Sequence, residues 1–391
     1  MIGMEQTIDT YKLTGTEKAS DEVSSQLRKT STRDQRFDIL RSVSMMMIVM
    51  LHYIYHGIRH VGSYGGGNFV DCGFTQDIVS EVNFLIYQFL GYMADIGPNL
   101  FILISGYFLI KPRSFQSVAH KAGHLWTTIA FYCIVIYGVL LAMGQVDFSV
   151  DSIISGLTPI YHKQYWFMSM YVPLLLLSPF LSKGIAGLTK REYEVLLLVL
   201  LVIHFSNNSV GYGHIYSSGT SLFFYIFVFL AGGYLRLYPI DKRIGKWGGA
   251  AYLMVCLVLT LLSAYTQLIK GTGGFPHIKG MANNSLPFLY AFFLFAWVVQ
   301  LKRTDTLVGR WAVKISPYVL AVYLIHDNGN IRRILWNQLI HTQDFIHSPW
   351  SVVHFAITCA LIFVLCIAIE WLRQYTSKAI KRIWRHVSLH A

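Results

Sequence analysis

The chain has 391 residues, of which 54% are hydrophobic and only 13% are charged, and its net charge is +12. This composition is far too apolar for a soluble globular protein, so the positive charge does not indicate a nucleic-acid partner. We expect an all-α, polytopic protein embedded in a lipid bilayer.

Ten segments are apolar over about the 20 residues that a membrane span needs. The fifth segment is short, and polar residues interrupt the ninth. The ten segments lie at 38–57, 84–110, 124–143, 165–182, 193–206, 221–238, 248–268, 285–301, 316–340 and 351–372.

The basic residues predict the orientation of these spans. With the N-terminus inside, 26 of the 32 Lys and Arg residues fall in cytoplasmic segments, as the positive-inside rule favours. We therefore expect about ten transmembrane helices with both termini cytoplasmic. Residues 1–35 are polar and mixed in charge, which is typical of a disordered tail. Residues 36–391 are predicted to form a single membrane domain.

The first span, RFDILRSVSMMMIVMLHYIYHG, carries ionisable side chains along one helix face. Arg41 and His52 are separated by about three helical turns, so they share that face. Asp38 lies three residues before Arg41 and can pair with it. An ionisable group deep in a membrane usually has a function. The alternatives are that His52 is a hydrogen-bonded packing residue, and that Arg36 and Arg41 only anchor the helix at the membrane edge.

His56 follows His52 by one turn, and a pair with this spacing can hold a metal ion. The sequence offers no evident third ligand. We therefore predict no metal site.

The second span contains ADIGPNLFILISGYFLIKPR. Gly97 and Pro98 permit a break in the helix, and the small residues Ser105 and Gly106 allow close helix contact. No GxSxG motif surrounds Ser105, so its position favours packing over nucleophilic catalysis. Tyr107 follows.

Lys121 and His124 lie one turn apart at the start of the third span, where a basic segment leads into it. Such a patch can hold phosphate groups, although more often it only anchors a helix.

Two later segments add polar or aromatic groups. Tyr165 and Trp166 begin the fourth span, where they either belong to an interfacial aromatic belt or pack against a sugar ring. His326, Asp327 and Asn328 interrupt the ninth span, and a polar cluster at that depth faces the bundle interior or water. Neighbouring residues point to different helix faces, so Asp327 need not orient His326.

These motifs, taken in order, resemble the acyltransferase type 3 family of integral-membrane acyltransferases. The resemblance rests on Arg36, Asp38, Leu40, Arg41 and His52, on ILISGYFLI at 102–110, and on the two later segments YWFMSMYVPLLLLSPFLS and ISPYVLAVYLIHDN. It covers residue 36 to about residue 330. Such proteins typically move an acyl group, usually acetyl, from cytosolic acyl-CoA to a sugar hydroxyl of a surface glycan.

The resemblance also implies roles for individual residues. The family's critical arginine and histidine correspond to Arg41 and His52. The family often has an Arg-x-x-Arg-like pair after the second span, where this chain has Lys121 and His124. A phosphate contact made by these two residues would be weaker than one made by two arginines.

Acyl transfer to an alcohol needs a base, and an imidazole is suited to that role. His52 is therefore the predicted base. Arg41, Arg36 and the basic segment at 111–124 are candidates for binding the CoA phosphates. The pantetheine arm would then follow the helix face past Met45 and Ile48 toward His52.

The oxyanion formed in the reaction needs hydrogen-bond donors, for which Tyr107, Ser105 and Trp166 are candidates. The predicted catalytic residues are therefore His52 and Arg41. The predicted substrate-binding residues are Arg36, Asp38, Ser105, Tyr107, Lys121, His124, Tyr165, Trp166, His326, Asp327 and Asn328.

The expected partners are acyl-CoA as donor substrate, a glycan or sugar acceptor and the lipid bilayer, with homo-oligomerisation left open. We expect no bound cofactor, and we expect a bacterial plasma membrane as the location. The main alternative is a secondary transporter or glycan flippase, which also has intramembrane charges and broken spans. Against it, the sequence has no inverted repeat, and its ionisable residues gather in the first span. A non-catalytic membrane partner of a glycan assembly machine is a third alternative.

Overall fold

The computed structural model describes residues 33–58, 74, 77–162, 164–209, 221–265, 286–303 and 305–390. All regular secondary structure in these residues is helical, which confirms the all-α fold class. The predicted tail is described only from residue 33, so residues 1–32 lie outside the described part of the chain. The helix itself begins at Gln35, because Asp34 accepts a hydrogen bond from the backbone N–H of Arg36 and caps the helix.

Seven helical segments of the described chain are long and apolar enough to cross a membrane. They are Gln35–Ile58, Ile78–Leu109, Phe115–Ala142, Trp166–Ala186, Lys242–Leu262, Leu307–His326 and Ser351–Ile380. Two further apolar helices, α9 (Leu222–Leu237) and α12 (Leu286–Gln300), are shorter. Helix α8 (Lys190–Ser209) occupies the predicted fifth span but is not one of the seven. The predicted count of ten is therefore not established.

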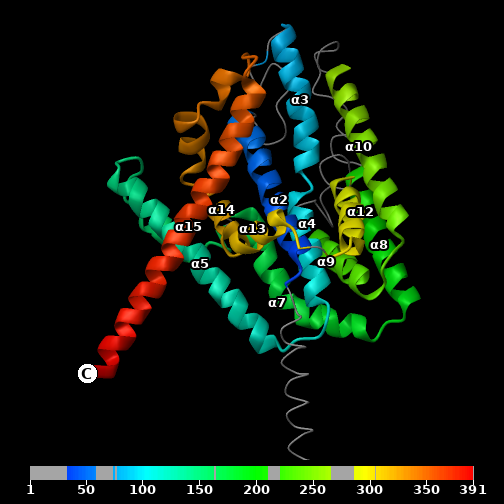
Figure 1. Ribbon diagram of the computed structural model, residues 1–391, viewed down its shortest axis with the longest axis horizontal. Coiled ribbons are helices and arrows are strands. Elements are labelled where there is room, and N and C mark those ends of the chain that lie inside the picture. The colour runs from blue at the N-terminus through cyan, green and yellow to red at the C-terminus, as the bar shows by residue number, and fades with distance from the viewer. Residues whose placement is uncertain are drawn as a thin grey trace, which may run out of the picture.

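Helix α2 (Gln35–His52) lies at the centre of the helical assembly, as the blue ribbon in Figure 1 shows. It packs against α3 (Ile78–Ala94), α4 (Gly97–Leu109), α13 (Leu307–Ile315), α14 (Val319–His326) and α15 (Ser351–His390). Its sequence is rich in Met and Leu, which are strong helix formers. The π-helix η1 (Tyr53–Ile58) continues it beyond His52.

The other helices enclose this centre. Helix α5 packs against α6 and α7, α7 packs against α9, and α10 packs against α3 and α12. Their bounds are Phe115–Ala142 for α5, Val150–Leu157 for α6, Trp166–Ala186 for α7 and Lys242–Ala264 for α10.

The predicted break in the second span is confirmed. Helix α3 ends at Ala94 and α4 begins at Gly97, with Pro98 in its first turn. Proline lacks a backbone N–H, and the N–H groups of a first helical turn have no partner within the helix in any case.

Gly106 lets α4 and α9 approach each other closely. A Cβ at Gly106 would collide with the carbonyl oxygen of Phe229, and a Cβ at Gly232 would collide with that of Leu103. The contact that the small residues of the second span predict is therefore confirmed.

The predicted ninth span is wrong at its C-terminal end. Helix α14 stops at His326, and the chain turns through Asp327 and Asn328 before the π-helix η4 (Ile334–Leu339) begins. The polar side chains thus end the helix rather than lying within it. Before α14, the chain passes through α13 and the short 3-10 helix η3 (Ser316–Tyr318).

Candidate active site

The ends of two packed helices bring His52 and His326 together. His52 is the last residue of α2, and His326 is the last residue of α14. Both side chains are buried, and Nδ1 of His52 lies 2.9 Å from Nε2 of His326. The fold therefore joins two candidates that the sequence presented separately.

The hydrogen bonds of these two rings define which nitrogen carries the proton. Nδ1 of His326 bonds the carbonyl oxygen of Val322, which can only accept, so Nδ1 of a neutral His326 carries the proton. Nε2 of His326 is then an acceptor, and Nδ1 of His52 must donate to it. The lone pair of a neutral His52 therefore lies on Nε2, which is the nitrogen left free to act as a base.

Asp327 places a carboxylate beside the two histidines of the first span. Its side chain is completely buried. Its Oδ1 lies 3.6 Å from Nδ1 of His52, 3.2 Å from Nε2 of His56 and 3.0 Å from Nε of Arg332. A buried carboxylate needs such positively charged or proton-donating neighbours to offset its lost hydration. The fold thus supplies the third potential metal ligand that the sequence did not reveal for His52 and His56.

Asn328 and Tyr165 hold the turn that follows α14. The Tyr165 hydroxyl donates to the carbonyl oxygen of Leu324 at 2.6 Å, and the Asn328 amide donates to the Tyr165 hydroxyl at 2.8 Å. Asn328 also accepts a hydrogen bond from the backbone N–H of Asn330 at 3.0 Å. Both side chains are buried. In this structure these two predicted substrate contacts support the backbone that carries Asp327.

Trp166 packs beside two aromatic side chains of the bundle. Its ring centroid is 6.0 Å from that of Phe167 and 6.4 Å from that of Tyr225.

Tyr323 is a neighbour of His52 that sequence reasoning missed. Its ring centroid is 6.0 Å from that of His52, and its buried hydroxyl has no hydrogen-bond partner among the described residues. An aromatic residue in an apolar helix gives no functional signal by itself. Its position three residues before His326, which puts both side chains on one helix face, is the signal that could have found it.

The opposite end of α2 carries a compact charged group. Buried Asp38 accepts two hydrogen bonds from Arg33, both of 2.7 Å, and one of 3.1 Å from Arg41. The predicted Asp38–Arg41 pair is therefore confirmed. The Arg41 side chain remains 32% exposed, and its guanidinium lies 5.8 Å from the centre of the Phe108 ring.

Arg36 is bound to the end of a neighbouring helix. Its guanidinium donates to the carbonyl oxygens of Val299 and Leu301, the first at 2.7 Å, and so caps the C-terminus of α12. It also pairs with Asp34 at 2.6 Å. This hydrogen-bonded pairing holds the pKa of Asp34 below its usual value. These bonds occupy the donors that Arg36 would offer to a phosphate group.

Tyr107 lies at the same end of α2 as Arg41. Its ring centroid is 5.1 Å from that of Phe37, which precedes His52 by about 22 Å of helical rise. Tyr107 is therefore too far from His52 to donate a hydrogen bond to an oxyanion there, and that prediction is wrong for this structure. Instead, Arg236 donates to the Tyr107 hydroxyl at 3.1 Å, and its guanidinium lies 4.9 Å from the ring centre. Arg236, in the last turn of α9, is a second cation near Arg41 that sequence reasoning missed.

Ser105 is bonded within the bundle. Its hydroxyl donates to the carbonyl oxygen of Phe101 at 2.9 Å and lies 3.1 Å from the Tyr171 hydroxyl. These bonds agree with a packing role. Lys121 and His124 are exposed on α5, and their side chains bond no other residue of the described chain.

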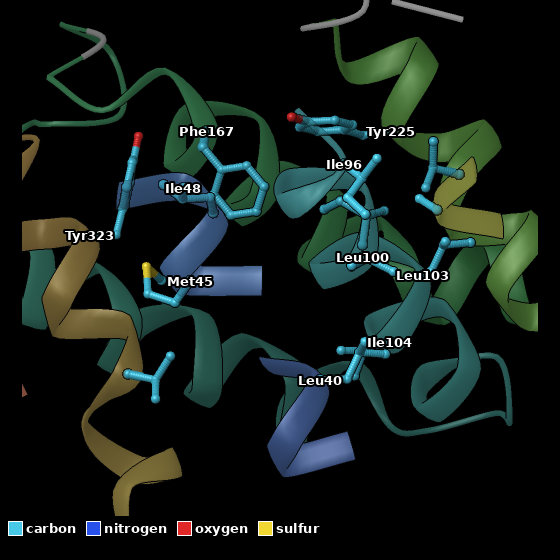
Figure 2. Close-up of a cluster of buried hydrophobic side chains, with 14 of the residues drawn as sticks. Leu40, Met45, Ile48, Ile96, Leu100, Leu103, Ile104, Phe167, Tyr225 and Tyr323 are labelled. Atoms are coloured by element: carbon cyan, nitrogen blue, oxygen red, sulfur yellow. The ribbon is translucent and has the colours of Figure 1, made fainter. Parts of the chain in front are cut away.

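The predicted path for the pantetheine arm is closed. Met45 and Ile48 are buried, and Figure 2 shows them within the same cluster of side chains as Phe167 and Tyr323. A donor substrate that followed this face would have to displace these packed side chains.

A protein-family model, the acyltransferase domain, matches residues 34–371. The chain belongs to this acyltransferase family. The match covers nearly the whole chain and includes both ends of α2, which confirms the resemblance drawn from the sequence motifs. No curated protein and no solved structure matches the chain. The family and the apolar helices together indicate a multi-pass membrane acyltransferase.

Proposed function

We propose that this protein is a membrane O-acyltransferase of the bacterial plasma membrane. It moves an acyl group, acetyl in the first instance, from cytosolic acyl-CoA to a hydroxyl of a cell-surface or exported glycan. Family membership supports the reaction class. The observation that carries the assignment of the base is the hydrogen bond between His52 and His326.

In this proposal, Nε2 of His52 removes the proton from the acceptor hydroxyl. The hydroxyl oxygen forms a bond to the thioester carbonyl carbon, and the carbonyl oxygen becomes an oxyanion. His326 keeps the proton of His52 on Nδ1 throughout, so Nε2 is the only nitrogen of that ring that accepts.

The intermediate then collapses, and the bond between carbon and sulfur breaks. The proton held on Nε2 of His52 passes to the leaving sulfur, so the products are the glycan ester and CoA with a free thiol. The unpartnered hydroxyl of Tyr323 is the donor we assign to the oxyanion, because it is buried beside His52.

Asp327 stabilises the positive charge that His52 carries between these two proton transfers. Its Oδ1 lies 3.6 Å from Nδ1 of that ring. In a buried site, where screening is weak, a carboxylate at this distance favours the charged imidazolium.

Arg41 and Arg236 are the donor-side residues of this proposal. Both guanidiniums contact the aromatic pair Tyr107 and Phe108, and Arg41 is partly exposed. Arginine side chains bind phosphate groups through two parallel hydrogen bonds. The CoA phosphates would therefore lie at this end of α2. Because Met45 and Ile48 are packed between this end and His52, these side chains must move for the acyl group to reach His52.

The test uses the full chain reconstituted in nanodiscs. Acetyl-CoA and a panel of glycan acceptors are added, and the release of free CoA thiol is followed together with ester formation on the glycan. We expect turnover by the wild type and by the control variant His162→Ala, whose histidine is exposed on a loop. His52→Ala should lose turnover, by about 10²–10⁴-fold if it removes the general base.

The same preparation distinguishes the transport alternative. A wild type that forms no ester with any acceptor, yet carries a glycan or a small solute across vesicle membranes, would overturn the acyltransferase proposal. A fully active His52→Ala variant would overturn the assignment of the base.

A further inference from the structure

A group of three potential metal ligands lies where η1 meets the turn after α14. The ring centroids of His52 and His56 are 4.9 Å apart, and Asp327 lies beside both rings. The ligand atoms of the three side chains all lie within 4.8 Å of one another. Two imidazoles and one carboxylate are a donor set that suits Zn²⁺.

Two of the three distances between these atoms suit a tetrahedral site. Ligand atoms bound at the usual distances from Zn²⁺ are separated by about 3.4 Å in that geometry. Oδ1 of Asp327 lies 3.2 Å from Nε2 of His56 and 3.6 Å from Nδ1 of His52. Small side-chain movements would therefore be enough to bind an ion.

The Asp327 carboxylate is an independent indication that a ligand is needed. It is completely buried, and within the described chain neither of its oxygens makes a hydrogen bond of good geometry. Arg332 approaches it, with Nε 3.0 Å from Oδ1, but that Nε also lacks a hydrogen bond. Burying polar groups without good hydrogen bonds is unfavourable, so the pairing with Arg332 leaves part of this carboxylate unsatisfied.

We propose that Nδ1 of His52, Nε2 of His56 and Oδ1 of Asp327 form a binding site for a divalent cation of the Zn²⁺ class, and that its occupation inhibits acyl transfer. The inhibitory part rests on the proposed function of His52. The side chain of His56 is 21% exposed, so protein does not fully enclose the site on that side.

The inhibition follows from the proton on the His52 ring. A neutral imidazole binds a metal through the nitrogen that carries no proton. Binding through Nδ1 therefore moves the proton of that ring from Nδ1 to Nε2, and the hydrogen bond to His326 is lost. Nε2 then carries a proton and has no lone pair with which to activate an acceptor hydroxyl.

Arg332 opposes the binding of a cation, because its guanidinium lies beside the shared carboxylate oxygen. Removing this charge should strengthen binding. An Arg332→Gln variant should bind Zn²⁺ at least about tenfold more tightly, because it removes a unit positive charge that repels the ion from a few ångströms away in a partly buried site. A site elsewhere on the molecule would not respond in this way.

The experiment titrates the purified full chain with ZnCl₂ by calorimetry. It also records the visible absorption of the Co²⁺-substituted protein, which is intense only for four-coordinate sites. We expect one Zn²⁺ per chain and a four-coordinate Co²⁺ spectrum. His56→Gln should bind at least about tenfold more weakly than the wild type, and the control His162→Gln should bind as the wild type does.

For each protein, the acyl-transfer rate measured in Zn²⁺ is divided by the rate of the same protein in a chelator. Differences in basal rate between variants therefore cancel. The ratio should fall for the wild type and stay near one for His56→Gln. A wild-type Co²⁺ spectrum without four-coordinate character would overturn the site, as would equal Zn²⁺ affinity in wild type and His56→Gln.

The two proposals fail in different ways. Zn²⁺ binding that depends on His56, in a chain with no acyl transfer, would support the site and overturn its inhibitory role together with the proposed function. An acyl-transfer rate that does not change when Zn²⁺ is added would overturn the inhibitory role of the site and support the proposed function.

Discussion

His52 and His326 share a hydrogen bond of 2.9 Å although 274 residues separate them in the chain. The bond joins the last residue of α2 to the last residue of α14. The carbonyl oxygen of Val322 can only accept a hydrogen bond from Nδ1 of His326. The proton positions of both rings therefore follow from the contact between His52 and His326.

Replacing His326 tests whether it acts by fixing the His52 proton. His326→Leu removes the acceptor, so kcat should fall by about 10²-fold or more, as for loss of a well-oriented base. His326→Gln keeps a carbonyl acceptor for Nδ1 of His52 and an amide donor for Val322, and it should keep most of the activity. Nitrogen NMR of histidine-labelled protein should show the Nδ1–H form of His52 in the wild type and in the Gln variant only. Equal activities of the Leu and Gln variants would contradict this role.

Asp327 is expected to contribute to both stability and rate. Asp327→Asn leaves Arg332 without its carboxylate, and breaking a buried pair in this way costs about 3–5 kcal/mol. The temperature of inactivation should therefore fall, and kcat should fall by about 10²–10⁴-fold because the His52 imidazolium loses its counter-charge. Adding Arg332→Gln should restore the inactivation temperature but not kcat. Recovery of kcat in the double variant would show that Asp327 only balances Arg332.

Arg41 and Arg36 should behave differently although both lie in the first two turns of α2. Arg41→Ala should raise the KM for acyl-CoA by about 10–100-fold, the loss expected for a hydrogen-bonded charge on a phosphate. Arg36→Ala removes the cap of α12 and should lower the inactivation temperature while leaving that KM within about twofold, because the Arg36 donors are already bound to protein. Steady-state kinetics with varied acetyl-CoA measures both. An equal rise in KM for the two variants would contradict the assignment.

Gly106 should be essential for the contact between α4 and α9. Gly106→Ala puts a Cβ against the Phe229 carbonyl and forces the helices apart, at a cost of about 1–3 kcal/mol. Gly138→Ala is the matched control, because a Cβ there meets no atom within 4 Å. Alanine favours a helix over glycine, so this control should be neutral or slightly stabilising. Thermal inactivation of the two variants in the same nanodiscs compares them, and an unchanged Gly106→Ala would show that the contact is dispensable.

Local features of this chain were predictable from its sequence. Gly97 and Pro98 indicate a helix break, and Gly106 indicates a close helix contact, because both depend on the backbone at one point. The choice of His52 as a candidate functional residue was also predictable, since an ionisable side chain in an apolar run is rare.

The partners of these residues were not predictable, because they depend on how distant helices pack. Charge alone cannot separate Arg36, which caps α12, from Arg41, which stays partly exposed. Tyr323 resembles any other aromatic residue of an apolar helix, and only the packing of α14 against α2 brings it near His52. The sequence predicts that His326 and Asp327 interrupt a span. In the structure the helix ends at His326, and the turn that follows places Asp327 beside His56.

The central claim is that His52 is the base of an acyl transfer from acyl-CoA to a glycan hydroxyl. The most direct test is the amount of labelled acetyl ester formed on an acceptor glycan by the reconstituted wild type and by His52→Gln, at matched inactivation temperatures. We predict ester formation by the wild type and a loss of about 10²–10⁴-fold in the variant. Equal ester formation by the two proteins would contradict the claim.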